Sequence, residues 1–171
     1  MIRKLIVVVA LVIGAGAVGA CGGGHRSTKA PASTTSAPAV VATDTWKPPD
    51  VPGPPSTAKF CTLLVAQYQH IKTNTIAVSL KVRQQIVADY VRFTPTVVAA
   101  APPEIAPAAA TYLQGTAKIL SLLNAAGLNA AKTPPGSIGT VLLDPQYNAA
   151  STRAVAFAQQ NCHYDIGGGV S

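Results

Sequence analysis

Residues 56–71 read STAKFCTLLVAQYQHI, and this stretch indicates the fold class. Four of its residues recur at steps of three and four, the spacing of one helical face. They are Cys61, Leu64, Tyr68 and Ile71. Ser56 or Thr57, following two prolines, is a suitable N-cap. We therefore expect an amphipathic helix to begin here.

The same periodicity returns three times before Cys162, and strand-like alternation is nowhere sustained. The second segment ends near Ala101, and Pro95 should kink or shorten it. The apolar positions of this segment are Ile76, Leu80, Val87, Val91 and Val98. The sequence thus predicts a second helix antiparallel to the first.

The third and fourth segments carry clear helix boundaries. The third opens at Pro103 and Glu104 and should stop at Gly127. Its face consists of Ile105, Ala109, Tyr112, Thr116, Ile119 and Leu123. The fourth opens with the cap Asp144 and proline at the first helical position, Pro145. Its face consists of Tyr147, Ser151, Ala154, Ala158 and Cys162. A short helical turn is expected at 140–143.

The N-terminal residues have the three parts of a signal peptide. Arg3 and Lys4 form a basic region, residues 5–13 an apolar core, and residues 14–17 a small-residue stretch. The apolar run 5–20 has 16 residues, fewer than the roughly 20 that cross a bilayer as a helix. It leads into Val18-Gly19-Ala20-Cys21, which resembles the lipobox of bacterial lipoproteins. That resemblance implies cleavage before Cys21, attachment of diacylglycerol and a fatty acyl chain such as palmitate to it, and location on the extracytoplasmic face of the cell membrane.

Residues 22–55 are rich in proline, alanine, serine, threonine and glycine. Such a composition buries too little apolar surface to offset its ordering entropy. We therefore expect four parts: a signal peptide at 1–20, the lipidated cysteine and a disordered tether at 21–55, a helical domain at 56–165, and a flexible glycine-rich tail at 166–171. Trp46, the only tryptophan, lies in the expected tether and either packs on the domain or faces solvent.

Four amphipathic segments with two short connections predict an all-α, up-down-up-down four-helix bundle. In that topology the first helix starts where the fourth ends, which brings Cys61 near Cys162. With Cys21 lipidated, these two cysteines are the remaining pair of an exported chain, so we expect a disulfide that clamps the bundle. A metal site using both thiols and His163 is the alternative, but no metal-ligand spacing supports it.

Charge argues against a nucleic-acid partner. The chain has 13 Lys and Arg against 6 Asp and Glu, and loss of Arg3 and Lys4 leaves a net charge of +5. The basic residues are dispersed rather than grouped to neutralise successive phosphates. A mild attraction to anionic headgroups or wall polymers remains reasonable.

Three short motifs extend the resemblance beyond the lipobox. They are Phe60-Cys61, Ala101-Pro102-Pro103-Glu104 and Asn161-Cys162. With the tether, they make the chain similar to a broad set of small actinobacterial cell-envelope lipoproteins with an all-helical domain. The resemblance implies localisation and fold, and no functional residue transfers from it.

The sequence contains no catalytic, metal or cofactor motif, so we expect a protein that is not an enzyme. His70 falls off the face that Tyr68 and Ile71 share, which predicts a solvated histidine. The domain has only four side-chain carboxylates, and its two histidines, His70 and His163, are expected off the core, so stability should vary little between mild acid and neutrality. Helical rise places Tyr68, Tyr90 and Tyr112 in one layer, either as ordinary core aromatics or as a polar-lined ligand pocket.

Two functions remain open from the sequence. The first is a partner-binding or accessory module, held at the membrane by its lipid, whose domain contacts an envelope protein. The second is a carrier or sensor of a lipid or other small hydrophobic ligand between the helices.

Overall fold

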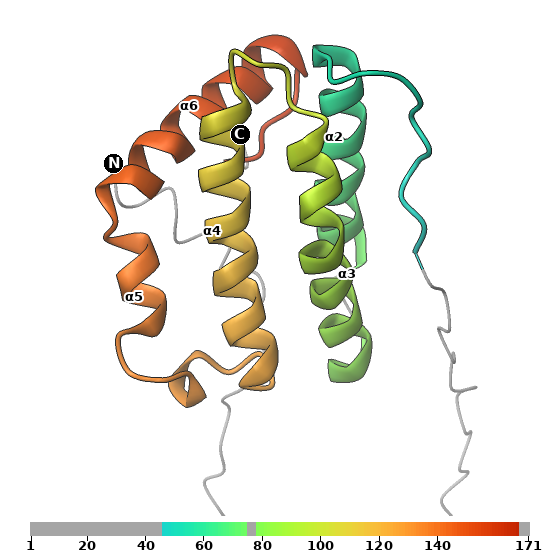
Figure 1. Ribbon diagram of the computed structural model, residues 1–171. Helices are drawn as coiled ribbons and strands as arrows, with labels where there is room; N and C mark the ends of the chain where they lie inside the picture. The colour runs from blue at the N-terminus through green and yellow to red at the C-terminus, as the bar shows by residue number, and fades with distance from the viewer. Residues whose placement is uncertain (1–45, 75–77, 168–171) are drawn as a thin grey trace, which may run out of the picture.

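The computed structural model describes residues 46–74 and 78–167. These residues form helices α2 (Thr57–Asn74), α3 (Leu80–Ala99), α4 (Ala106–Ala125), α5 (Ser137–Leu142) and α6 (Pro145–Asn161), with a 3-10 turn η2 (Ala130–Lys132) before α5 (Figure 1). No strand occurs within these residues, so the predicted all-α class is confirmed. The expected signal peptide, Cys21, residues 22–45, Ile76 and the tail residues 168–171 lie outside the described residues.

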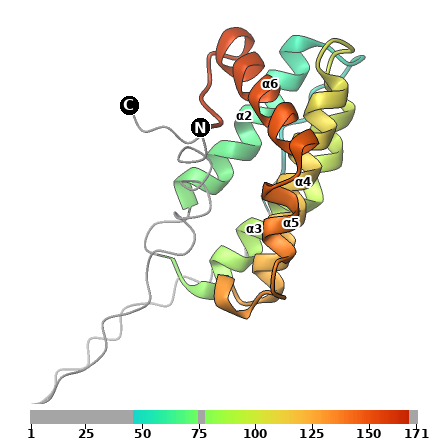
Figure 2. The ribbon, with the colours of Figure 1, turned by 90° about the vertical axis from the view of Figure 1, so that its left-hand side faces the viewer.

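The helices pack largely in chain order. α3 lies between α2 and α4, and α4 contacts α3 on one side and α5 and α6 on the other (Figures 1 and 2). The predicted short turn at 140–143 is the six-residue helix α5. α5 and α6 follow one another along α4, with α6 inclined to it (Figure 1). The short turn and the fourth helix that the sequence predicted are therefore the two successive helices α5 and α6.

Local side-chain chemistry accounts for the helix starts. The Asp144 side chain accepts a hydrogen bond from the Gln146 backbone N–H, and Pro145 follows it as expected. Ser79 caps α3 by accepting from the backbone N–H of Val82. α4 begins three residues later than Pro103, because residues 103–105 form a turn closed by the Ile105 and Ala106 N–H groups donating to the Pro102 carbonyl.

The helix ends lie close to their predicted positions. α4 stops at Ala125, and Gly127 follows with φ of +66°, as a left-handed C-terminal residue should. α3 continues through Pro95 to Ala99. Proline leaves the carbonyl four residues earlier without its usual partner. Next to that position, Gln67 of α2 donates a side-chain hydrogen bond to the Tyr90 carbonyl at 2.9 Å, linking the two helices.

Small residues bring α4 and α6 close together. Ala109 and Ala158 are fully buried, and Ala154 nearly so. At Gly115 in α4 an added Cβ would lie 2.5 Å from Cδ2 of Tyr147 in α6. The tyrosine ring therefore rests directly on the α4 backbone, which fixes how closely these two helices approach.

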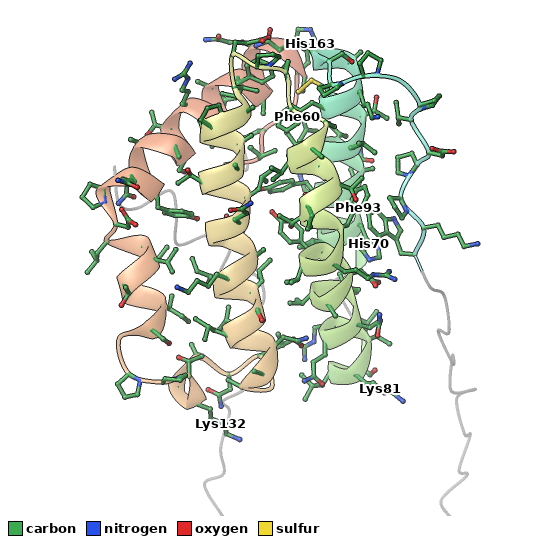
Figure 3. The ribbon with its side chains drawn as sticks, viewed as in Figure 1. Phe60, His70, Lys81, Phe93, Lys132 and His163 are labelled. Carbon is green, nitrogen blue, oxygen red and sulfur yellow. A yellow bond between two sulfur atoms is a disulfide. The ribbon has the colours of Figure 1, made fainter. Side chains whose placement is uncertain are left out.

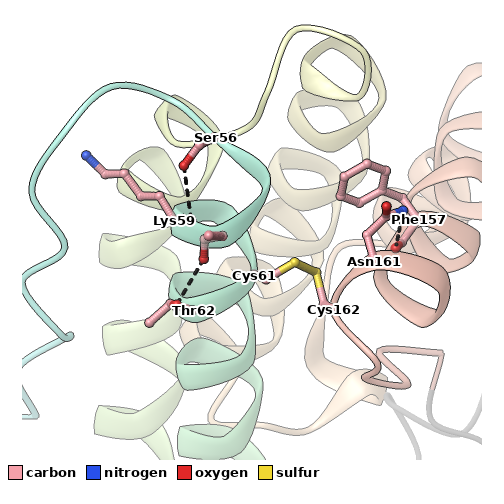
Figure 4. Close-up of a disulfide and its surroundings, with 8 residues drawn as sticks. Ser56, Lys59, Cys61, Thr62, Phe157, Asn161 and Cys162 are labelled. Carbon is pink, nitrogen blue, oxygen red and sulfur yellow. Dashed lines mark hydrogen bonds between the residues drawn. A yellow bond between two sulfur atoms is a disulfide. The ribbon is translucent and has the colours of Figure 1, made fainter.

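The first and last long helices are joined covalently. Cys61 in the second turn of α2 and Cys162 at the end of α6 form a disulfide with Cα atoms 5.1 Å apart (Figure 4). Phe60 and Phe157 meet beside it edge to face, with ring centroids 5.9 Å apart. The predicted cysteine pairing is present, and the two helices otherwise contact each other little.

Removal of this disulfide should lower stability strongly. In a Cys61→Ser/Cys162→Ser variant the unfolded chain regains the freedom of a loop spanning 101 residues, which the chain-entropy model values at about 4.7 kcal/mol. We expect a much lower Tm by circular dichroism, reproduced in the wild type by reductant. An unchanged midpoint in both experiments would show that helix packing alone holds the fold.

Candidate functional site

Each of the four long helices contributes one tyrosine to a central cluster. Tyr68 comes from α2, Tyr90 from α3, Tyr112 from α4 and Tyr147 from α6. The rings of Tyr68 and Tyr90 meet edge to face at 5.8 Å between centroids, and those of Tyr112 and Tyr147 lie 5.8 Å apart. The structure thus brings together the three tyrosines that the sequence placed in one layer, and adds a fourth.

The cluster's hydroxyl groups are only partly paired. Tyr68 donates to the Tyr112 hydroxyl at 3.1 Å, and Tyr147 shares a hydrogen bond with Thr116 at 3.1 Å. The Tyr90 hydroxyl is buried and has no hydrogen-bond partner among the described residues. Its ring contact with Tyr68 places it beside the paired hydroxyls. Entry of a ligand here stays a prediction.

A further polar group is buried close to the cluster. Gln67 is fully buried, and its amide donates to the Tyr90 carbonyl and to the Thr94 hydroxyl, both at 2.9 Å. Its side-chain carbonyl oxygen has no partner among the described residues. A buried acceptor and a buried hydroxyl without partners are costly in an apolar core. Together they form a polar patch inside the apolar core.

Burial dominates the acid–base properties of the tyrosines. Desolvation raises the pKa of Tyr68, Tyr90 and Tyr112 well above the ordinary value of 10.0. Electrostatic repulsion from neighbouring tyrosines raises the pKa further, and hydrogen bonding within the cluster opposes part of the rise. Burial also raises the pKa of Tyr147, opposed by its hydrogen bond with Thr116. These four hydroxyl groups therefore remain neutral across the physiological range.

The cluster predicts a loss of stability in alkali. Because the folded-state pKa values lie above those of the unfolded chain, the unfolded chain releases protons first as pH rises past about 10. Each of the three deeply buried tyrosines then lowers the free energy of unfolding by up to about 1.4 kcal/mol per pH unit. We expect phenolate absorbance to rise cooperatively with loss of helical circular dichroism.

Tyr90→Phe tests the same point. Its hydroxyl has no partner among the described residues, so neutral-pH stability should change by less than about 1 kcal/mol, while the alkaline loss becomes less steep. Tyr68→Phe, which removes a hydrogen bond to Tyr112, is the matched comparison. A gradual titration of all five tyrosines before unfolding would contradict the burial argument.

A second cluster lies on the outer side of α2 and α3, and the sequence did not predict it. The Trp46 indole stacks on the His70 imidazole with ring centroids 4.3 Å apart and planes 14° apart. It also meets Phe93 edge to face at 5.1 Å, and Figure 3 shows His70 and Phe93 beside this segment. Val51 packs against the core as well. We call residues 46–55 the strap.

Beneath the strap lies a buried carboxylate. Asp89 in α3 is 1 % exposed, and one of its oxygens accepts from Arg92 at 2.9 Å and from Gln85 at 3.0 Å. Its other oxygen lies 3.4 Å from Nε2 of His70. The Arg92 side chain is 65 % exposed, so solvent reaches this ion pair from one side. Carboxylate, imidazole and indole thus form a layered contact between the strap and two helices.

Two sequence-based expectations differ from this arrangement. His70 is not a solvated histidine, because its side chain is only 9 % exposed between Trp46 and Asp89. The expectation that stability varies little in mild acid stays a prediction, and one of the histidines on which it rests lies 3.4 Å from the buried Asp89 carboxylate. Residues 46–55, expected to be tether, include the packed side chains of Trp46 and Val51. The spacing of Gln85, Asp89 and Arg92 at steps of four and three was the signal available.

The sole tryptophan reports on this contact. His70→Ala should remove the stacking surface, so that Trp46 emission moves toward the wavelength of a solvated indole and stability falls by about 1 kcal/mol. His163→Ala is the matched control, because His163 is exposed after the last helix. Equal emission in the two variants would show that the strap is held without His70.

Cys21, the expected lipidation site, lies outside the described residues. Among the described residues no group of three or more His, Cys, Asp or Glu is placed to hold a metal ion. Of the helices that the structure describes, none has the length and apolar character to cross a bilayer.

Comparison with protein-family models, with curated proteins and with solved structures found no match.

Proposed function

We propose that this chain is the precursor of an envelope lipoprotein of actinobacterial type, cleaved before Cys21 and anchored by lipid on the extracytoplasmic face of the membrane. In this proposal the helical domain is a non-enzymatic module that binds an envelope protein. The observation that carries the compartment is the Cys61–Cys162 disulfide, because such bonds persist mainly in oxidising compartments. The signal-peptide pattern and lipobox in residues 1–21 supply the anchor.

A rigid domain suits a binding module. We propose that α2, α3, α4 and the α5–α6 pair form an up-down-up-down bundle, with the disulfide closing its two outer elements. The support is that each long helix packs mainly on its neighbour in the chain. A clamped bundle presents its outer faces in a fixed arrangement, which limits the ordering that binding must impose.

The strap changes the expected reach of the anchor. With Trp46 held on the domain, 24 residues, 22–45, separate it from Cys21. A chain of that length spans at most about 75 Å as polyproline II and averages about 25 to 30 Å as a flexible coil. The domain would therefore remain close to the membrane for much of the time.

A ligand carrier or sensor is the second proposal. Its support is the pair of buried polar atoms without described partners, the Tyr90 hydroxyl and the Gln67 side-chain oxygen. A small amphipathic molecule with a polar head could satisfy them while its apolar part packs on the tyrosine rings. Native mass spectrometry of the purified protein would detect a bound molecule, and Tyr90→Phe should weaken its retention.

The anchor is tested at Cys21. The Cys21→Ser chain should lose incorporation of a tagged fatty acid and leave the membrane fraction, since the thiol that accepts lipid is absent. Cys61→Ser/Cys162→Ser is the matched control and should keep both the label and the membrane association. Labelling of the Cys21→Ser chain would contradict the proposed anchor.

A further inference from the structure

The end of the domain opposite the disulfide carries a cluster of basic side chains. We call this set the cationic end. It consists of Lys81 and Arg83 at the start of α3 and Lys132 in η2. Figure 3 places Lys81 and Lys132 at this end, with Phe60 and His163 at the other.

No carboxylate belongs to the described segments that form this end. The described acidic residues are Asp50 in the strap, Asp89 midway along α3, Glu104 before α4, Asp144 before α6 and Asp165 after α6. The basic side chains are therefore not part of a surface of alternating charge. Within the described residues, this end has a uniform positive sign.

Helix energetics do not explain the two basic residues at the start of α3. Lys81 and Arg83 occupy the first turn of α3, which holds no acidic residue and where a cation is unfavourable. Their placement opposes the stability of α3 and adds to the positive potential at its N-terminus.

An exposed leucine lies among these charges. Leu80, the first residue of α3, is 46 % exposed and directly precedes Lys81. An isolated exposed leucine is ordinary on a protein surface. Beside several cations it has the composition of segments that lie in the interface of anionic bilayers, where the apolar side chain enters the headgroup region.

We propose that the cationic end docks on a bilayer surface rich in anionic phospholipid. Lys81 and Lys132 would face the headgroup phosphates, Leu80 would enter between them, and the half-buried Arg83 would add to the positive potential. This inference rests on the proposed anchor, which keeps the domain near such a surface. Each basic residue close to an anionic membrane strengthens binding by about fivefold. The attraction falls off within a Debye length, about 8 Å at physiological ionic strength.

Lysine reactivity measures this contact in the full lipidated chain. The protein is reconstituted in vesicles of phosphatidylcholine, or of equal parts phosphatidylcholine and phosphatidylglycerol, and treated with a water-soluble acylating ester. Mass spectrometry then follows Lys81, Lys132 and Lys59, which lies near the disulfide. We expect severalfold protection of Lys81 and Lys132 in the anionic vesicles alone, reversed by high salt. Lys59 should react equally in both.

Charge reversal separates docking from folding. Lys81→Glu should reduce the protection of Lys132 about fivefold or more, while leaving Tm unchanged or slightly higher because it removes a cation from the start of α3. Lys132→Glu should likewise reduce the protection of Lys81. Lys59→Glu is the matched control and should alter neither.

Three outcomes would overturn the inference. They are equal protection in both kinds of vesicle, protection that high salt leaves unchanged, and protection by dissolved polyphosphate but not by anionic vesicles. Anchoring is scored separately by flotation with phosphatidylcholine vesicles. Absence of flotation there contradicts the anchor, whereas flotation without selective lysine protection contradicts only the docking.

Discussion

The disulfide between Cys61 and Cys162 is the constraint on which the closed form of this domain depends. α3 and α4 have extensive neighbours on both sides, but α2 and α6 are the outer elements and touch each other little. The covalent bond joins them where packing is thin, next to the contact of Phe60 with Phe157. A core rich in alanine gains less from each buried side chain than one rich in leucine. Constraint of the unfolded chain offsets part of that deficit.

Local patterns predicted much of this fold because they act over one or two helical turns. The cap at Asp144 with Pro145, the stop near Gly127 and the start of the first helix at Thr57 are all short-range effects. A short turn before the fourth helix was predicted at 140–143, but α5 begins at Ser137, since six residues are too few to show a helical period. Pro95 was expected to kink or shorten its helix. α3 continues four residues beyond it, and neighbouring helices can support such a segment.

The two side-chain clusters show where sequence reasoning ends. Helical rise alone places Tyr68, Tyr90 and Tyr112 at similar heights, because their helices run the length of the domain. Tyr147 could not be assigned to the cluster without knowing how α6 inclines to α4. Gly115 permits that arrangement because it leaves room for the tyrosine ring. The sequence correctly placed His70 off the helix face that carries Tyr68. What covers that side chain is Trp46, which is 24 residues earlier in a segment of low-complexity composition.

Both the strap and the cationic end affect the position of the domain relative to the proposed anchor. A domain held by a long free tether would sample many orientations, and no end would contact the membrane preferentially. Attachment at Trp46 removes ten residues from the tether and fixes the point at which it meets α2 and α3. A shorter tether raises the effective concentration of the domain at the surface. Weak electrostatic contacts at one end can then select an orientation that they could not hold in free solution. Lys81 and Arg83 lower the stability of α3 but help to orient the domain at the membrane. The disulfide offsets that loss because it stabilises the fold.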